Sequence, residues 1–197
     1  MKTGNVLILP GWQNSGPAHW QSFWEAQYGY ARLVQHDWDR PLRGDWIARL
    51  EDVVLDLSAS EPHQPLEPIT LVAHSLGCVL VAAWAAISRN TQRVGCAMLV
   101  APGDVEREAL RPVLTSWSPI ELTKLPFPSL LVGSQNDPYC SVERARSYAS
   151  AWGSEFVDYG PFGHINGDSG LGGWPQGHGM LLALQQRALK QATGFKK

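Results

Sequence analysis

Cysteine is scarce in this chain, since only Cys78, Cys96 and Cys140 occur among 197 residues. An odd number of scattered cysteines is typical of reduced thiols inside helices and strands, and it excludes a disulfide framework. No two of them have the spacing of metal ligands. We therefore expect neither disulfide bonds nor a metal site.

The chain also lacks an excess of charge of either sign and any long hydrophobic run. Sixteen Lys and Arg residues stand against 18 Asp and Glu residues, a formal net charge of −2. This balance argues against binding to nucleic acid or to an anionic membrane. The first apolar run, Val6–Leu9, stops at Pro10 and is too short for a signal peptide or a membrane span. We expect a cytoplasmic protein.

Hydrophobic residues make up 44% of the chain, which is enough for residues 1–197 to form a single globular domain with a full core. Short apolar, β-branched runs alternate with amphipathic stretches. Strands that are apolar on both faces and separated by helices predict a doubly wound, mainly parallel sheet of about six strands with helices on both faces. The runs are Val6–Leu9, Ala31–Gln35, Ile69–Ala73, Val94–Ala101, Ser129–Gly133 and Glu155–Tyr159.

Helical spacing of apolar residues predicts helices around Trp46–Leu57 and Leu181–Leu189. Pro17 is expected in the first turn of a helix that carries Trp20. The segment from Gly103 to Pro128 is too short for a separate cap domain.

One serine lies at the apex of a predicted strand, tight turn and apolar helix, in the sequence Ala73-His74-Ser75-Leu76-Gly77. This pattern is typical of a nucleophile elbow, whose strained turn needs small residues two positions before and after the serine. Alanine at the first of these positions departs from the strict G-x-S-x-G motif but is small enough. The alternative is an ordinary helix start capped by Ser75.

Three further segments accompany the elbow: Leu9-Pro10-Gly11-Trp12-Gln13-Asn14-Ser15 with His19-Trp20, then Gly133-Ser134-Gln135-Asn136-Asp137-Pro138, and Gly163-His164-Ile165-Asn166. In these segments and their order, the chain resembles the small serine hydrolases that include retinoblastoma-binding protein nine and bacterial YdeN-like relatives. The resemblance implies a compact α/β-hydrolase fold without a large cap. It also implies Asp137 and His164 as partners of Ser75, and a site-shaping role for His19.

Chain order and spacing point to the same two partners independently. In this fold the acid and then the histidine follow the serine, each on a loop after a strand. Asp137 comes four residues after the run ending at Gly133, and His164 comes five residues after the run ending at Tyr159. Two alternatives stay open: Asp104, better explained as the N-cap of a helix over 105–114, and His178, which does not directly follow a strand.

When the serine attacks a carbonyl group, the carbonyl oxygen becomes an oxyanion, which needs two N–H donors. We expect them from the backbone of Leu76, at the amino end of its helix, and of Trp12. Gly11 then either lets this loop approach the serine closely or serves as a simple turn glycine. Trp117 and Trp174 fall in loops expected to border the site and are predicted to line an apolar acyl pocket.

These residues predict a serine hydrolase that needs no metal or cofactor and acts on a small-molecule acyl substrate through a covalent acyl-enzyme. A carboxylesterase-like activity is favoured, but the same triad serves thioesters, amides and acyl transfer. The alternative class is a protein-interaction protein on the same fold. The resemblance associates the vertebrate namesake with retinoblastoma-protein binding through L-x-C-x-E, and this chain has no such motif.

Overall fold

The six strands form one parallel sheet in the order β2-β1-β3-β4-β5-β6. This computed structural model describes residues 5–58 and 67–194. The prediction of a parallel sheet of six strands is confirmed, with β2 shorter than expected. The strands are β1 (Val6–Leu9), β2 (Ala31–Arg32), β3 (Ile69–His74), β4 (Val94–Val100), β5 (Ser129–Gly133) and β6 (Glu155–Asp158).

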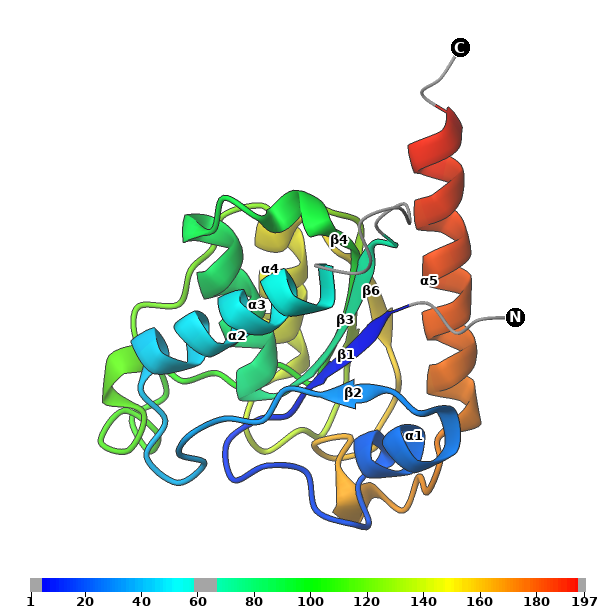
Figure 1. Ribbon diagram of the computed structural model, residues 1–197. Coiled ribbons are helices and arrows are strands. Elements are labelled where there is room, and N and C mark those ends of the chain that lie inside the picture. Colours follow the sequence, from blue (N-terminus) through cyan, green and yellow to red (C-terminus); the bar gives the residue numbers. More distant parts are fainter. Residues whose placement is uncertain (1–4, 59–66, 195–197) are drawn as a thin grey trace.

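Helices cover both faces of this sheet, so the doubly wound architecture is confirmed (Figure 1). On one face lie α2 (Arg43–Ser58), α3 (Leu76–Ile87) and α4 (Val142–Trp152), and on the other lie α1 (Trp20–Tyr28) and α5 (Pro175–Gly194). Two hydrophobic clusters correspond to these two faces. The described residues also form three short 3₁₀ helices, η1 (Thr91–Arg93), η2 (Thr115–Trp117) and η3 (Gly167–Ser169).

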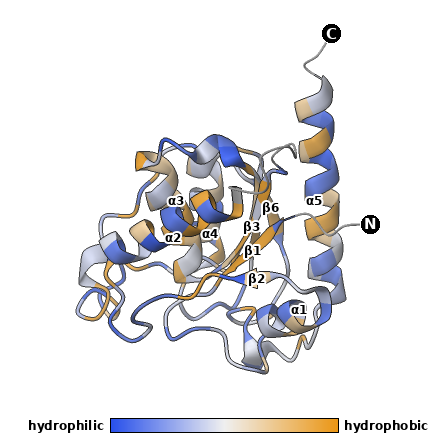
Figure 2. Ribbon diagram, viewed as in Figure 1, coloured by the Kyte–Doolittle hydropathy of each residue, from blue (hydrophilic) through white to orange (hydrophobic). Residues whose placement is uncertain are grey.

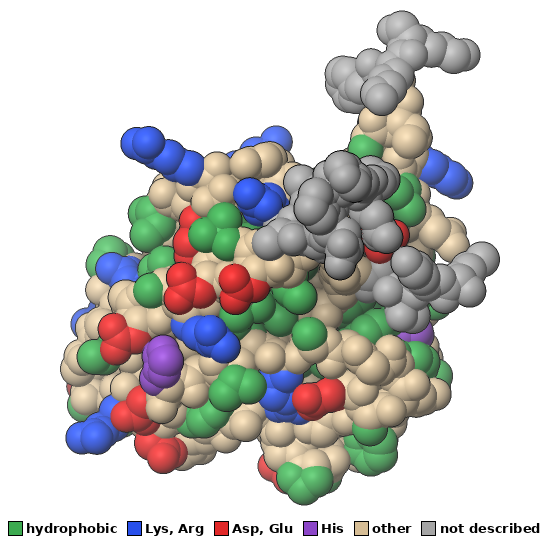
Figure 3. Space-filling view, in the orientation of Figure 1, with side chains coloured by type: hydrophobic (Ala, Val, Ile, Leu, Met, Phe, Trp, Pro, Cys, Tyr) green, Lys and Arg blue, Asp and Glu red, His purple; other side chains and the backbone are tan. Residues whose placement is uncertain are grey.

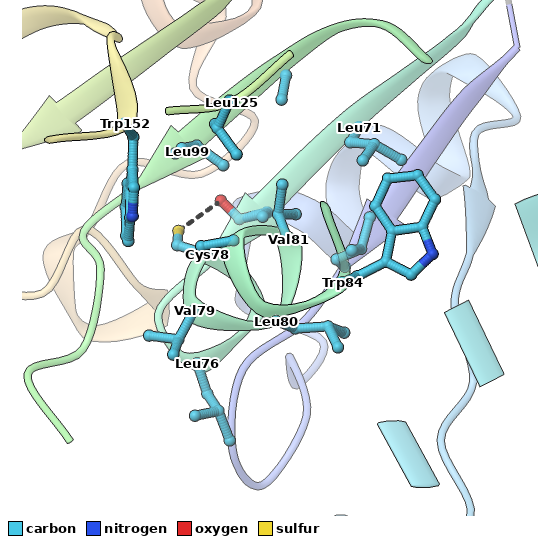
Figure 4. Close-up of a cluster of buried hydrophobic side chains, with 14 of the residues drawn as sticks. Leu71, Leu76, Cys78, Val79, Leu80, Val81, Trp84, Leu99, Leu125 and Trp152 are labelled. Atoms are coloured by element: carbon cyan, nitrogen blue, oxygen red, sulfur yellow. Dashed lines mark hydrogen bonds between the residues drawn. The ribbon is translucent and has the colours of Figure 1, made fainter. Parts of the chain in front are cut away.

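Helix α3 is the most buried of the helices, and every residue from Leu76 to Trp84 is buried. A helix that is apolar all round must be enclosed by other elements. Its side chains pack among residues of the central strands, Leu125 and Trp152 (Figure 4). The most hydrophobic ribbon in the molecule is found in the central strands and this helix (Figure 2). The first residue of α3 follows Ser75, so this rigid core fixes the position of that serine.

Two local expectations were wrong. Helix α1 begins at Trp20, and its N-cap is His19, whose Nδ1 accepts a hydrogen bond from Gln21 N (3.1 Å), so Pro17 lies outside the helix. Residues 105–114 form a series of turns instead of an α-helix. Asp104 Oδ1 accepts a hydrogen bond from Glu106 N (3.3 Å), as a cap would, but the carboxylate also bonds to Tyr148 Oη (2.9 Å) and Arg144 Nε (3.5 Å) of α4. The residues that follow form turns and do not continue as an α-helix.

Charged side chains of both signs are interspersed on the face shown in Figure 3. Among the described residues, no helix combines the length and the apolar character that a membrane crossing requires.

Candidate active site

Ser75 lies at the sharp turn between β3 and α3 with φ 53° and ψ −119°. This conformation is strained for a residue with a side chain, and it persists only where the surrounding structure enforces it. Gly77 explains how the turn fits, because a Cβ atom there would lie 2.5 Å from the carbonyl oxygen of Leu9. The small residue in the elbow motif therefore lets α3 pass directly against β1.

The structure brings Ser75, His164 and Asp137 together. His164 Nε2 lies 2.8 Å from Ser75 Oγ, across 89 residues of sequence. His164 Nδ1 lies 2.8 Å and 3.0 Å from the two carboxylate oxygens of Asp137. A carboxylate accepts hydrogen bonds, so Nδ1 carries the proton and Nε2 is free to accept the Ser75 hydroxyl proton. The side chains of His164 and Asp137 are only 9% and 2% exposed, which shields this chain of hydrogen bonds from water.

The loops that carry the acid and the histidine are bonded to each other. Asn136 Oδ1 accepts a hydrogen bond from Gly163 N (2.6 Å). Ser134 Oγ accepts one from Phe162 N (3.0 Å) and donates one to Gly160 O (3.0 Å). Sequence reasoning assigned no role to Ser134 or Asn136, although both belong to the segment that ends at Asp137. Two polar residues just before a candidate acid were the available signal.

The two expected oxyanion donors border the same cavity as Ser75. Leu76 and Trp12 both line it, and within the described part of the chain neither backbone amide donates a hydrogen bond to a protein acceptor. The Trp12 indole is directed elsewhere, donating to Asp39 O (3.0 Å). Gly11 packs against the elbow instead of lining the cavity.

The cavity in front of Ser75 has a volume of about 440 Å³. Gly103 and three apolar side chains of the following segment form one part of its lining, while the segments 13–19 and 166–168 contribute polar side chains, among them Asn14 and Asp168. The Tyr139 ring packs against the His164 imidazole, with centroids 4.6 Å apart. The apolar side chains of this lining include Val105, Leu110 and Leu114, and His19 also borders the cavity.

Trp117 and Trp174 do not line this cavity, so that expectation is corrected. Both are fully buried. Trp117 packs edge-to-face on Trp46 and donates to Pro41 O (2.9 Å). Trp174 stacks on Trp24 in the cluster on the opposite face of the sheet. Large indoles that find hydrogen-bond partners inside the protein gain more from packing than from lining a wet pocket.

Both alternative residues are bonded to other parts of the chain. His178 Nε2 lies 2.8 Å from Tyr30 Oη, and its ring stacks on Tyr28 with centroids 3.9 Å apart. Asp104 is occupied by α4, as described above. His164 is therefore the histidine that is hydrogen-bonded to Ser75, and Asp137 is the carboxylate that is hydrogen-bonded to His164.

His74 packs against His164, with ring centroids 4.8 Å apart, and His19 packs against His74. His74 Nε2 lies 2.9 Å from the carbonyl oxygen of His164, and the rings of His19 and His74 are 4.6 Å apart. Burial lowers the pKa of His19 to about 3, with Arg32 and His164 adding to the effect. Burial also lowers the pKa of His74 far below its ordinary value, followed by the effects of His19 and His164. Both rings are therefore neutral at neutral pH. The His74 ring bonds to the backbone of His164, whereas the His164 ring bonds to Ser75.

Cys78, one helical turn beyond Ser75, is fully buried, and burial raises the pKa of its thiol. A buried thiol with a raised pKa is a poor nucleophile. Among residues 5–58 and 67–194, no group of three or more His, Cys, Asp or Glu side chains is arranged to hold a metal ion.

A family model described as serine hydrolase matches residues 6–183. Among solved structures, the chain is similar to a protein from Pectobacterium atrosepticum described as a YdeN-like hydrolase, with 29% identity, a TM-score of 0.78, and coverage of 93% of this chain and 91% of that one. It is also similar to the ydeN gene product of B. subtilis (18%, 0.70, 92% and 98%) and to Est1E from Butyrivibrio proteoclasticus (13%, 0.65, 98% and 90%). The last two, at such low identity, show the fold alone. No curated protein sequence matches this chain.

Proposed function

Because the chain belongs to the serine hydrolase family, we propose that it hydrolyses a small acyl substrate with Ser75 as nucleophile, His164 as general base and Asp137 as the acid that orients His164. The observation that carries this assignment is the 2.8 Å contact between Ser75 Oγ and His164 Nε2. A serine hydroxyl is a poor nucleophile at neutral pH and needs a base at this distance.

The reaction proceeds by two transfers of the acyl group. Ser75 Oγ attacks the substrate carbonyl carbon while its proton passes to His164 Nε2. The tetrahedral intermediate collapses, the bond to the leaving group breaks, and His164 returns the proton to that group. Water then attacks the acyl-enzyme by the same route and frees Ser75. Asp137 keeps the Nδ1–H tautomer and stabilises the imidazolium formed in each step.

The backbone N–H groups of Leu76 and Trp12 stabilise the oxyanion of each tetrahedral intermediate. Such donors act strongly because they are held in place before the reaction begins, and losing one typically costs about 3–4 kcal/mol of transition-state stabilisation. The Leu76 amide also lies at the amino end of α3, where the helix dipole favours negative charge.

A carboxylic ester is the bond that we propose for this site. Esters need less help than amides in expelling the leaving group, and the cavity of about 440 Å³ has an apolar wall suited to a short acyl chain. The same triad chemistry extends to thioesters and amides, so a panel of the three substrate types measures the preference.

Labelling with a fluorophosphonate probe tests the assignment. The wild-type protein is expected to be labelled at Ser75 and to hydrolyse a p-nitrophenyl ester. Ser75→Ala and His164→Ala should each reduce kcat by a factor on the order of 10⁶, while His178→Ala, the matched histidine control, should retain most activity. Labelling of Ser75→Ala at the wild-type rate would refute the proposal.

A further inference from the structure

Two consecutive carbonyl groups of the loop that carries His164 are held by ring N–H donors from other parts of the chain. His74 Nε2 bonds to the carbonyl oxygen of His164 (2.9 Å). Trp20 Nε1 donates to the carbonyl oxygen of Ile165 (2.8 Å). His74 ends β3 and Trp20 begins α1, and both are buried. The backbone that follows β6 is thus fixed at two adjacent points.

These bonds hold a strained segment. Ile165 has φ 45°, a value that is an outlier for a β-branched residue. Its side chain is fully buried. A conformation of this kind persists only where the surroundings determine it, and such strain clusters at functional sites. Without the two donors, the backbone at Ile165 would be free to relax toward an unstrained geometry and to carry the imidazole of His164 with it.

The state of His74 suits this task. Its ring packs against those of His19 (centroids 4.6 Å apart) and Trp20 (6.2 Å). Burial keeps the ring neutral by lowering its pKa, and a neutral imidazole carries a single N–H. Because a carbonyl oxygen only accepts hydrogen bonds, this proton is on Nε2.

We propose that His74 and Trp20 are positioning residues that hold the His164–Ile165 backbone so that the His164 imidazole meets Ser75 Oγ. His74 directly precedes Ser75 in the chain. The end of β3 therefore positions the nucleophile and, through the His74 hydrogen bond, also positions the loop that carries His164. This inference rests on the proposed function of Ser75 and His164.

A pair of matched tryptophan variants tests the role of Trp20. Trp20→Phe removes the N–H and keeps most of the ring. Trp24→Phe is the control, because Trp24 lies in the same helix and the same buried cluster but donates to Gly173 O (2.7 Å). We expect Trp20→Phe to lower kcat by a factor of about 10 to 100 with KM changed less than about twofold, since small misplacements cost such factors. Trp24→Phe should change kcat less than about twofold. Urea unfolding of both variants measures their stability.

A second pair tests His74. His74→Met removes the donor, whereas His74→Gln places an amide N–H near the position of Nε2. His74→Met is expected to lower kcat and the fluorophosphonate labelling rate by a factor of about 10 to 100, and His74→Gln to restore most of both.

Equal losses of kcat in Trp20→Phe and Trp24→Phe, or no rescue by His74→Gln, would overturn the proposal. If His74→Met fails to fold, the tryptophan pair decides the matter. Absence of labelling in the wild-type protein would instead refute the proposed function, so the two failures are distinguishable.

Discussion

Gly11 lies directly against Ser75, so that a Cβ atom added to Gly11 would be 2.7 Å from the Cβ atom of Ser75 and 3.2 Å from the amide nitrogen of Leu76. The loop after β1 therefore presses on the elbow from the side of the proposed oxyanion donors. The glycine is needed here for its lack of a side chain, because Gly11 is not among the residues with positive φ.

Gly11→Ala is expected to displace either this loop or the elbow. We predict a loss of kcat/KM on the order of 10²-fold and a decrease of about 1–3 kcal/mol in the free energy of unfolding. Ester hydrolysis and urea denaturation measure the two effects. Gly44→Ala is the control, since a Cβ there meets no atom within 4 Å and the residue lies in α2, and it should leave activity intact. Full activity of Gly11→Ala would show that the contact is not needed.

Substitution of the two candidate acids, Asp137 and Asp104, is expected to have different effects on catalysis and on stability. Asp137→Asn should lower kcat by roughly 10⁴-fold with little change in stability, because an amide stabilises the wrong tautomer of His164. Asp104→Asn weakens the contacts to Tyr148 and Arg144, so it should cost about 1–2 kcal/mol of stability and leave kcat nearly unchanged. Kinetics and thermal unfolding of both variants test this. A larger loss of kcat in Asp104→Asn than in Asp137→Asn would show that Asp104, and not Asp137, is the catalytic acid.

Buried His19 makes stability depend on pH. Its pKa is about 3 in the folded protein and about 6.5 when unfolded. Between these values the unfolded chain binds a proton that the folded protein does not, so the free energy of unfolding falls as the pH drops from about 6.5 toward 3. His19→Asn keeps an N-cap side chain without the titration. We predict that unfolding of the variant depends less steeply on pH, by up to about 1.4 kcal/mol per pH unit. If the free energy of unfolding had the same pH dependence in His19→Asn and in the wild-type protein, His19 would not be the source of this dependence.

The cavity predicts a preference for short acyl chains. Buried methylenes contribute about 0.8 kcal/mol each only if they leave water. The cavity lining mixes apolar side chains such as Leu110 and Leu114 with polar ones such as Asn14 and Asp168, so it offers apolar contact to only part of a long chain. We expect kcat/KM to be higher for p-nitrophenyl acetate and butyrate than for the palmitate. Leu114→Ala should lower the butyrate-to-acetate ratio by up to about tenfold, while Leu125→Ala, buried in the same cluster but away from the cavity, should not. A steady rise in kcat/KM to long chains would contradict this prediction.

The sequence alone determined the fold because its signals are local. Short runs that are apolar on both faces and alternate with helical patterns favour parallel strands in a covered sheet, and the elbow motif restricts how one strand meets the helix that follows it. These patterns predicted the parallel six-stranded sheet and the helices on both faces, and the short segment from Gly103 to Pro128 predicted the absence of a large cap. The order of the motifs also indicated the serine hydrolase family, and the family match confirms it.

Tertiary structure decided which loop residues meet. Indoles in a loop predict a pocket and a core equally well from sequence, and packing placed Trp117 and Trp174 in the core. At Asp104 the bond to Glu106 N is present, but the same carboxylate also binds α4 and the expected helix over 105–114 is replaced by turns. The support of His164 by His74 and Trp20 depends on hydrogen bonds that span 90 and 145 residues. Such contacts arise from the stacking of whole elements on the sheet, and no spacing within a segment of sequence encodes them.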